Sequence, residues 1–249
     1  MPSATPVPAP RSAPLSESRS HSDESPPLTD RAGPIADLVR RATSADVRAT
    51  SRLHVEHLPV GLFPSLGARF VARWHRAHID SGNGVALVSY DPAGDGVVTG
   101  FLVGSVDRTA FRVDLLTRHR RELLLHGAGA LIVRPRVLAR FVRTRSSAYL
   151  RRLRRSGTSD RVPGQAVADL TAIAVVPQRH RRGAGRALTE EFLRICVHAG
   201  AAHAELVADN AASGFYERIG WESGRSASTR DGQSLRWFSI DLHHGRTGQ

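Results

Sequence analysis

The sequence predicts an α/β fold, in which a central sheet is covered by helices. Two observations indicate this class. Short runs rich in β-branched residues precede segments with the helical spacing of apolar residues, most clearly at 171–176 and 184–196. A hydrophobic content of 41% in 249 residues is also sufficient for a single core with extensions.

The two ends of this fold can be delimited by composition. Residues 1–34 are rich in Pro, Ser and Ala without a hydrophobic period, so we expect a disordered tail before one domain at 35–245. No apolar run is long enough to cross a bilayer, and no signal peptide is expected. The single Cys196 excludes an internal disulfide and favours the cytoplasm. Its helical face, shared with Leu188 and Phe192, makes it a core residue rather than a nucleophile.

The net charge of +12 comes entirely from arginine on the basic side, because the chain contains no lysine. The excess of 35 basic over 23 acidic residues points to an anionic ligand, a nucleic acid or a membrane surface. The missing lysine removes the central group of P-loop nucleotide hydrolysis and of Schiff-base chemistry.

The N-terminal half predicts helices followed by a hairpin. Residues 35–52 form a helical or partly strand-like lead, in which 46–50 could be the first strand. Apolar residues at helical spacing then predict a helix over 66–78. Strands are predicted at 85–90 and 97–106, on either side of a turn-rich Asp/Pro/Gly segment.

Residues 107–165 form an insertion dominated by Arg, Leu and Val. Pro135 divides it into two predicted helices, at about 108–130 and 136–155. The second helix carries an apolar face and many arginines. Such a helix can pack or dimerise with its arginines in solvent, lie on an anionic membrane, hold a phosphorylated ligand or bind nucleic acid. The sequence leaves these alternatives open.

A glycine turn follows the strand predicted at 171–176. Gly183 and Gly185 let the backbone bend sharply, so that N–H groups and the positive end of the following helix converge on one point. Arginines at 181, 182 and 186 add donors for phosphate oxygens. A dinucleotide-binding fold would require a small residue where Leu188 stands, so we interpret the turn as another kind of pyrophosphate site.

A second motif lies about twenty residues downstream. A strand at 204–209 leads into a short helical segment that contains Tyr216 and ends in Glu-Arg-Ile-Gly-Trp at 217–221. Together the two motifs, over about 166–222, resemble the GNAT superfamily of acyl-CoA-dependent N-acetyltransferases. The resemblance implies a mixed, mostly antiparallel sheet that is splayed at the cofactor site and flanked by helices, with the Arg-rich helical insertion added.

The resemblance also implies the reaction. We expect transfer of an acetyl group from acetyl-CoA, as co-substrate, to a primary amine of a small molecule or amino sugar, by direct attack in a ternary complex. A protein N-terminus is the second acceptor considered, and a non-catalytic acyl-CoA-binding regulator is the alternative from another class. An anionic acceptor or a membrane surface could contact the insertion. The protein is expected to be a cytoplasmic monomer or homodimer.

The cofactor residues follow from the same resemblance. The backbone of Ile173, Ala174 and Val175 would pair with the pantetheine arm, and a backbone N–H near Val175 would polarise the thioester. His180 stands where the family usually has Gln or Arg, and Asn210 would contact the cofactor near the pantetheine. The turn expected to hold the pyrophosphate comprises His180, Arg181, Arg182, Gly183, Ala184, Gly185 and Arg186.

Tyr216 is the candidate acid for the departing thiolate, although it could simply be a core aromatic residue beside Phe215. Six positions separate Asn210 from Tyr216 where many relatives have seven. Either the loop is shorter or Asp209 stands in the Asn position.

The candidate bases are Glu205 and Asp169, and either could instead be a solvated strand residue. Alternation along a regular strand predicts that Asp169 shares a face with Thr171, Ile173 and Val175.

Two histidine pairs, 54/57 and 75/78, have the three-residue spacing that can place both rings on one helix face. No cysteine or carboxylate-rich segment completes a ligand set, so no metal is expected. We expect these histidines to line the acceptor side or to lie at the surface.

Overall fold

The computed structural model describes residues 39–59, 62–91, 96–121, 124–125, 165–180, 182–228 and 234–242. The predicted tail at 1–34 and the predicted helix at 136–155 lie outside these ranges. The described helices are α1 (Val47–His57), α2 (Leu62–Leu66), α3 (Ala68–Asp80), α4 (Arg108–Arg118), the 3₁₀ turn η2 (Pro177–Arg179), α8 (Ala184–His198) and α9 (Asn210–Arg218). The strands are β1 (Val39–Arg41), β2 (Gly84–Tyr90), β3 (Val98–Ser105), β4 (Val167–Val175), β5 (His203–Asp209), β6 (Glu222–Ser228) and β7 (Ser234–Asp241).

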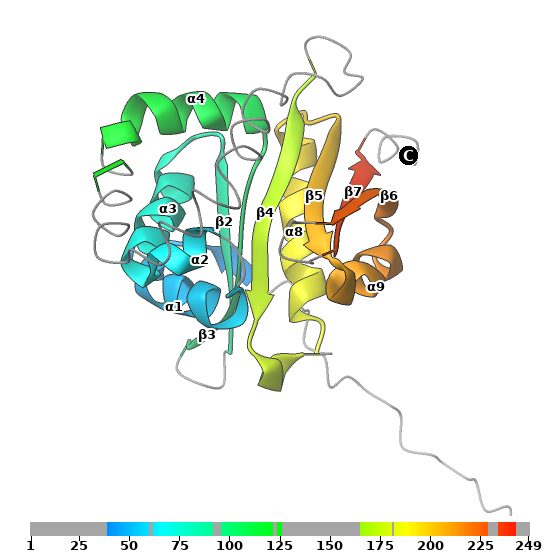
Figure 1. Ribbon diagram of the computed structural model, residues 1–249, viewed down its shortest axis with the longest axis horizontal. Coiled ribbons are helices and arrows are strands. Elements are labelled where there is room, and N and C mark those ends of the chain that lie inside the picture. Colours follow the sequence, from blue (N-terminus) through cyan, green and yellow to red (C-terminus); the bar gives the residue numbers. More distant parts are fainter. Residues whose placement is uncertain are drawn as a thin grey trace, which may run out of the picture. The chain divides into compact units, whose positions relative to one another are not determined.

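The strands form one seven-stranded sheet in the order β1-β2-β3-β4-β5-β7-β6 (Figure 1). Every neighbouring pair is antiparallel except β4 and β5, which run parallel with α8 as their connection. A parallel pair requires such a crossover, because a hairpin reverses the chain direction and can join only antiparallel strands. The predicted mixed α/β class with a mostly antiparallel sheet is confirmed.

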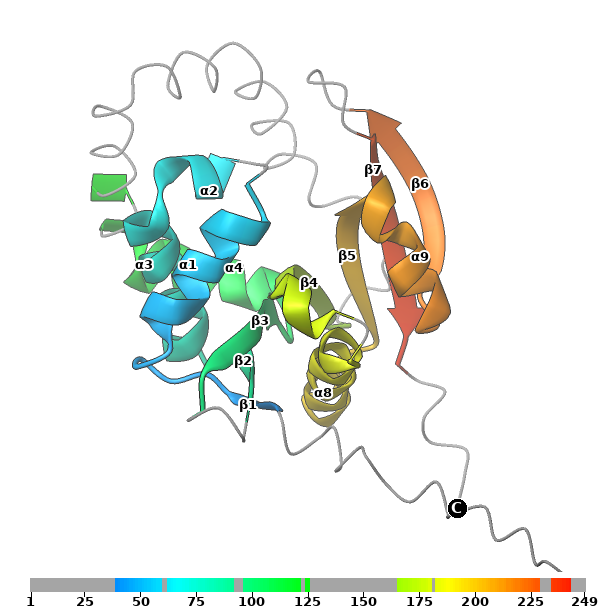
Figure 2. The same ribbon diagram turned by 90° about the horizontal axis from the view of Figure 1, so that it is seen from below.

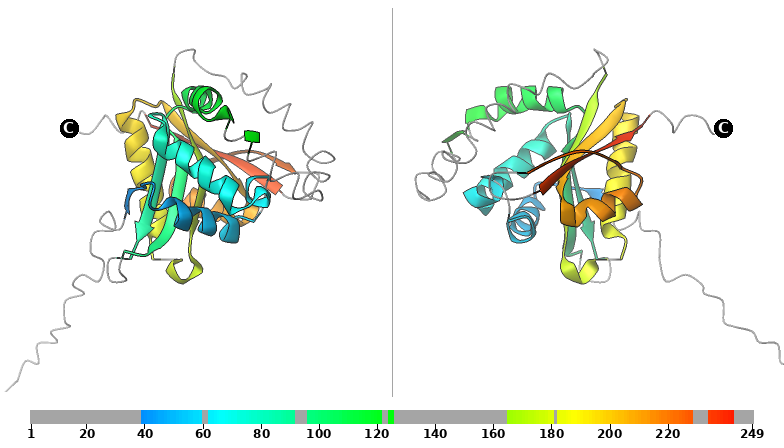
Figure 3. Two further views of the ribbon diagram at one scale, coloured as in Figure 1. Left: turned by 90° about the vertical axis from the view of Figure 1, so that its left-hand side faces the viewer. Right: turned by 45° about the vertical axis from the view of Figure 1, so that its right-hand side comes forward.

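Helices cover both faces of this sheet (Figures 2 and 3). Leu188, Phe192 and Cys196 of α8 belong to a core cluster with Leu87 and Leu102 of the hairpin strands. On the other face, Trp74 of α3 packs with side chains that alternate with these along the same two strands, namely Ala86, Val88, Phe101 and Val103. The period of two along the strands therefore produces two cores.

Strand β4 carries a bulge that changes which face its side chains occupy. Its register with β3 pairs Val103 with Ala172 but Gly104 with Leu170, so Thr171 is the extra residue. A Cβ on Gly104 would lie 2.5 Å from the Asp169 carbonyl oxygen, so glycine is required there. Leu170 before the bulge faces the α8 core.

The bulge makes one prediction wrong. Ile173 and Val175 pack against the same α8 core as Leu170, on the opposite face from Asp169. The predicted shared face of Asp169 with these two residues assumed a regular strand, and one inserted residue inverts the alternation.

The prediction that 46–50 could be a strand is also wrong, because α1 begins at Val47. Asp46 accepts the Thr43 N–H and hydroxyl and binds both guanidinium nitrogens of Arg40. These contacts fix the turn that starts the helix. The helix at 66–78 and the strands at 85–90 and 97–106 are confirmed within two residues at each end.

Three of the four paired histidines lie in the core rather than at the surface. His54, His75 and His78 are 5%, 1% and 1% exposed. His54 Nδ1 lies 3.1 Å from His75 Nε2, and His75 Nδ1 lies 2.9 Å from Thr50 Oγ1. Within the described residues, no group of His, Cys, Asp and Glu could hold a metal ion.

Cys196 is fully buried, as predicted, and burial raises the pKa of its thiol to about 12. The part of the chain that the structure describes has no helix with the length and apolarity needed to traverse a bilayer.

Candidate functional site

The central feature of the site is the separation of β4 from β5. The two strands are paired only from Val167 with His203 to Leu170 with Leu206. β4 continues to Val175 and β5 to Asp209 without further pairing to each other. Beyond the bulge, backbone N–H and C=O groups of β4 that point towards β5 thus lack a neighbouring strand and can bind an extended ligand.

The glycine turn lies at the end of β4 where the strands are apart. Gly183 is the N-cap of α8 and has a φ of 83°, a left-handed conformation that residues with a Cβ adopt only with strain. The first backbone bond of α8 runs from the Ala187 N–H to the Gly183 carbonyl. In the described chain no acceptor is recorded for the N–H groups of residues 183–186, which suits an anion at this helix end.

Side chains around the turn hold it against the sheet. His180 Nε2 donates to the Val175 carbonyl over 2.8 Å, and Arg179 forms an ion pair with Asp91. Arg182 is exposed, while Arg186 contacts Glu190 one helical turn on, at 2.7 Å. Arg181 lies outside the described residues.

The start of α9 faces the same opening. A Cβ on Gly185 would lie 3.5 Å from the ring of Phe215 and 3.9 Å from Val175, so α8, α9 and the end of β4 meet here. Asp209 ends β5 and caps α9, since its carboxylate accepts the Ala212 N–H. Asp209, seven positions before Tyr216, therefore takes the strand-ending position, and Asn210 is the first residue of the helix.

Tyr216 of α9 is 5% exposed and belongs to the core cluster that contains Trp221 and Phe238. The ring packs on Phe215, Trp221 and Phe238. Burial, and then the charge of Asp209, raise the pKa of the phenol well above its ordinary value. Among the described residues the hydroxyl is neither hydrogen-bonded nor fully enclosed, so it can donate to a ligand.

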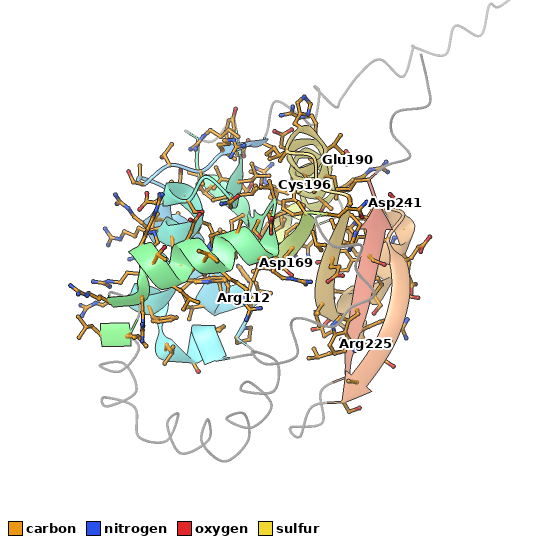
Figure 4. The ribbon with its side chains drawn as sticks, turned by 90° about the horizontal axis from the view of Figure 1, so that it is seen from above. Arg112, Asp169, Glu190, Cys196, Arg225 and Asp241 are labelled. Atoms are coloured by element: carbon orange, nitrogen blue, oxygen red, sulfur yellow. The ribbon has the colours of Figure 1, made fainter. Side chains whose placement is uncertain are left out.

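The two candidate bases are neighbours across the parallel pair. Asp169 and Glu205 are direct partners, one position before the last paired residues. Arg108, the first residue of α4, places Nη1 2.7 Å from Glu205 Oε2 and 3.5 Å from Asp169 Oδ1. Figure 4 shows Asp169 beside the N-terminal end of α4. Neither carboxylate is therefore a freely solvated strand residue.

The geometry agrees with a match to a family of known proteins. Residues 159–239, which contain the splayed strands, the glycine turn and α9, match the acetyltransferase (GNAT) domain. These residues carry a GNAT acetyltransferase domain. No curated protein matches the chain by sequence.

Solved GNAT structures have the same fold. An aminoglycoside 6'-N-acetyltransferase complexed with coenzyme A has a TM-score of 0.52 at 9% identity, over 82% of this chain and 97% of that one. Arabidopsis thaliana NAA60 in complex with acetyl-CoA has a TM-score of 0.51 at 12% identity, over 82% and 98%. Ard1 from Thermoplasma volcanium has a TM-score of 0.50 at 15% identity, over 82% and 95%. At these identities the likeness concerns the fold.

The GNAT domain brings most of the sequence-predicted residues to one place. The end of β4, the glycine turn and α9 surround the opening, while Asp169 and Glu205 lie where it begins. Sequence analysis missed Arg108 as a site residue. The available signal was Asp107, a helix-capping residue directly after a strand, which would have placed Arg108 at the start of a helix near the sheet.

Proposed function

We propose that the chain is an N-acetyltransferase that transfers the acetyl group of acetyl-CoA to a primary amine. One observation carries the proposal: β4 and β5 separate after residue 170, and β4 then leads through a left-handed glycine turn to the start of α8, whose first N–H groups are capped by no side chain. An extended thioester carrier fits this arrangement. The helix start can bind its diphosphate, and the side of β4 that lacks a neighbouring strand can bind its amide-containing arm.

The residues at the opening suit both parts of acetyl-CoA. The N–H groups of residues 183–186, with the exposed Arg182, would bind the diphosphate. The backbone groups at 173–175 that face away from β3 have no partner in β5, and those other than the Val175 carbonyl, which His180 binds, would hold the pantetheine arm as a strand-like partner. From Val175 back to Asp169 is six residues, about 20 Å of strand. The acetyl end would therefore approach the region of the two carboxylates.

The chemistry is a direct substitution. The amine nitrogen attacks the thioester carbon, the C–N bond forms and the C–S bond breaks. Sulfur leaves as a thiolate and takes the phenolic proton of Tyr216, and the surplus proton on the new amide nitrogen restores the phenol through solvent. Glu205, or Asp169, would accept the proton that the acceptor brings as an ammonium ion.

No covalent enzyme intermediate is part of this proposal. Cys196 is the only cysteine, and its burial and raised thiol pKa oppose a thiolate nucleophile. The place of action proposed is the cytoplasm, on the evidence of this single reduced cysteine.

The acceptor proposed is a small amine or amino sugar, with a protein N-terminus as the second candidate. The test is transfer from isotopically labelled acetyl-CoA to a panel of small amines, amino sugars and peptides, with products identified by mass spectrometry. We expect acetylated product from at least one amine. Acetyl-CoA binding with no transfer to any member would instead favour the non-catalytic regulator.

A further inference from the structure

The position of Arg108 is fixed by the local fold. β3 ends at Ser105, which is the register partner of Asp169. Asp107 then caps α4 by accepting the N–H groups of Thr109 and Ala110, at 2.7 and 3.1 Å. These bonds anchor the first turn of α4, so the Arg108 side chain starts at a defined point above the β4–β5 pair.

Two partly buried carboxylates among the described residues contact Arg108. Its side chain and those of Asp169 and Glu205 are 26%, 24% and 23% exposed, so solvent screens the cluster only in part. His203 Nε2 lies 3.5 Å from Glu205 Oε1. Further charged groups of the described residues lie on the same elements, among them Arg112, one turn further along α4, and Asp241, the β7 partner of His203 (Figure 4).

The two carboxylates are held differently. Glu205 makes the shorter contact with the guanidinium, at 2.7 Å against 3.5 Å. Asp169 is also bound by the hydroxyl of Thr171, the bulge residue, at 2.9 Å. Arg108 therefore orients Glu205, while the bulge orients Asp169.

We propose that Arg108 is a positioning residue for proton transfer: its guanidinium holds Glu205 at the start of the splayed region as an ionised carboxylate that accepts a proton from the acceptor ammonium. This rests on the proposed function. The proton passes from the nitrogen to Glu205 and then to solvent, leaving a neutral amine to attack the thioester. A cation beside a carboxylate favours its ionised form, so the guanidinium keeps Glu205 competent at lower pH.

The test compares the full-length wild type with Arg108→Gln, Arg108→Lys and Arg112→Gln on one acetylated amine. Profiles of kcat/KM against pH are measured for each, with acetyl-CoA affinity by calorimetry. For Arg108→Gln we expect the acidic limb of the profile, where kcat/KM falls at low pH, to shift to higher pH by about one unit. We also expect kcat to fall about tenfold and the affinity for acetyl-CoA to stay unchanged. Arg108→Lys should return the acidic limb to its wild-type pH and restore part of kcat, because lysine keeps the positive charge but lacks the forked donors of the guanidinium.

Arg112→Gln removes the same charge from the same helix and should leave the acidic limb at its wild-type position. If Arg108→Gln also leaves the limb in place, or if both variants move it equally, the positioning role is overturned. A wild type that acetylates no amine overturns the proposed function itself. The two failures are therefore distinguishable.

Discussion

At the scale of single residues, Tyr216 combines a buried ring with a hydroxyl that has no partner in the described chain. Core tyrosines usually find a hydrogen-bond partner, so an open hydroxyl beside a splayed sheet favours a ligand-directed role over a purely structural one. The phenol is protonated at neutral pH even at its ordinary pKa, and burial raises that pKa further, so the hydroxyl carries the proton that an acid must supply.

Tyr216→Phe should lower kcat about a hundredfold and leave acetyl-CoA affinity and melting temperature nearly unchanged. The ring contacts remain, and the hydroxyl makes no bond in the described chain that stability would lose. Steady-state kinetics and thermal melting check this. Tyr90→Phe, which removes a hydroxyl from β2, serves as the control. Equal kcat for wild type and Tyr216→Phe would remove the acid assignment.

The strand-ending position of the second motif shows what sequence spacing could predict at this scale. The interval to Tyr216 left two alternatives, a shorter loop or Asp209 in place of the usual Asn. The cap formed by the Asp209 carboxylate on the Ala212 N–H favours the second. Capping is a three-dimensional bond, so spacing alone raised the alternative without deciding it. Asn210 as a cofactor contact stays a prediction.

At the scale of elements, the sequence predicted the glycine turn, the hairpin and the helix at 66–78, because each has a strong local signal. It failed for two elements whose conformation depends on contacts with neighbouring elements. At the bulge, Gly104 of β3 leaves room for the Asp169 carbonyl of β4, and at the start of α1 Asp46 binds Arg40 of β1. A pattern of alternating residues contains neither contact.

Helix α4 illustrates a third case. A helix was predicted at about 108–130. The structure confirms its start, but α4 ends at Arg118 with His119 as its C-cap, so one uninterrupted helix to 130 is wrong. Of the exposed large hydrophobic side chains in the described residues, two lie on this helix, at 113 and 116, and two lie further along the chain, at 124 and 125. The proposed contact of the insertion with an anionic acceptor or a membrane surface concerns the chain that follows and remains a prediction.

At the scale of the whole molecule, three histidines buried between α1, α3 and the sheet link stability to pH. Burial lowers the pKa of His54 and of His78 to about 4, and it also lowers the pKa of His75 well below the ordinary value of 6.5. These groups are neutral in the folded chain but bind protons in the unfolded chain below pH 6.5. Their stabilising contribution is therefore complete above pH 6.5 and is lost as the pH falls towards 4.

The wild type should lose about 2 kcal/mol of unfolding free energy per such histidine between pH 7.5 and 5. His78→Leu should flatten this dependence by the contribution of one group, whatever its effect on stability at pH 7.5. Urea unfolding at a series of pH values measures it. His198→Leu, at an exposed position of α8, is the control and should keep the wild-type slope. An unchanged slope in His78→Leu would contradict the linkage.

The central claim is that the glycine turn before α8 binds the diphosphate of acetyl-CoA, and calorimetric titration of the full chain with acetyl-CoA tests it most directly. Gly183 and Gly200 flank the same helix and have similar positive φ values of 83° and 77°. Alanine at either position costs about 1–2 kcal/mol of backbone strain. We predict binding by the wild type, equal affinity for Gly200→Ala, and at least about a tenfold loss for Gly183→Ala. Absence of binding by the wild type, or equal affinities for all three proteins, would contradict the account.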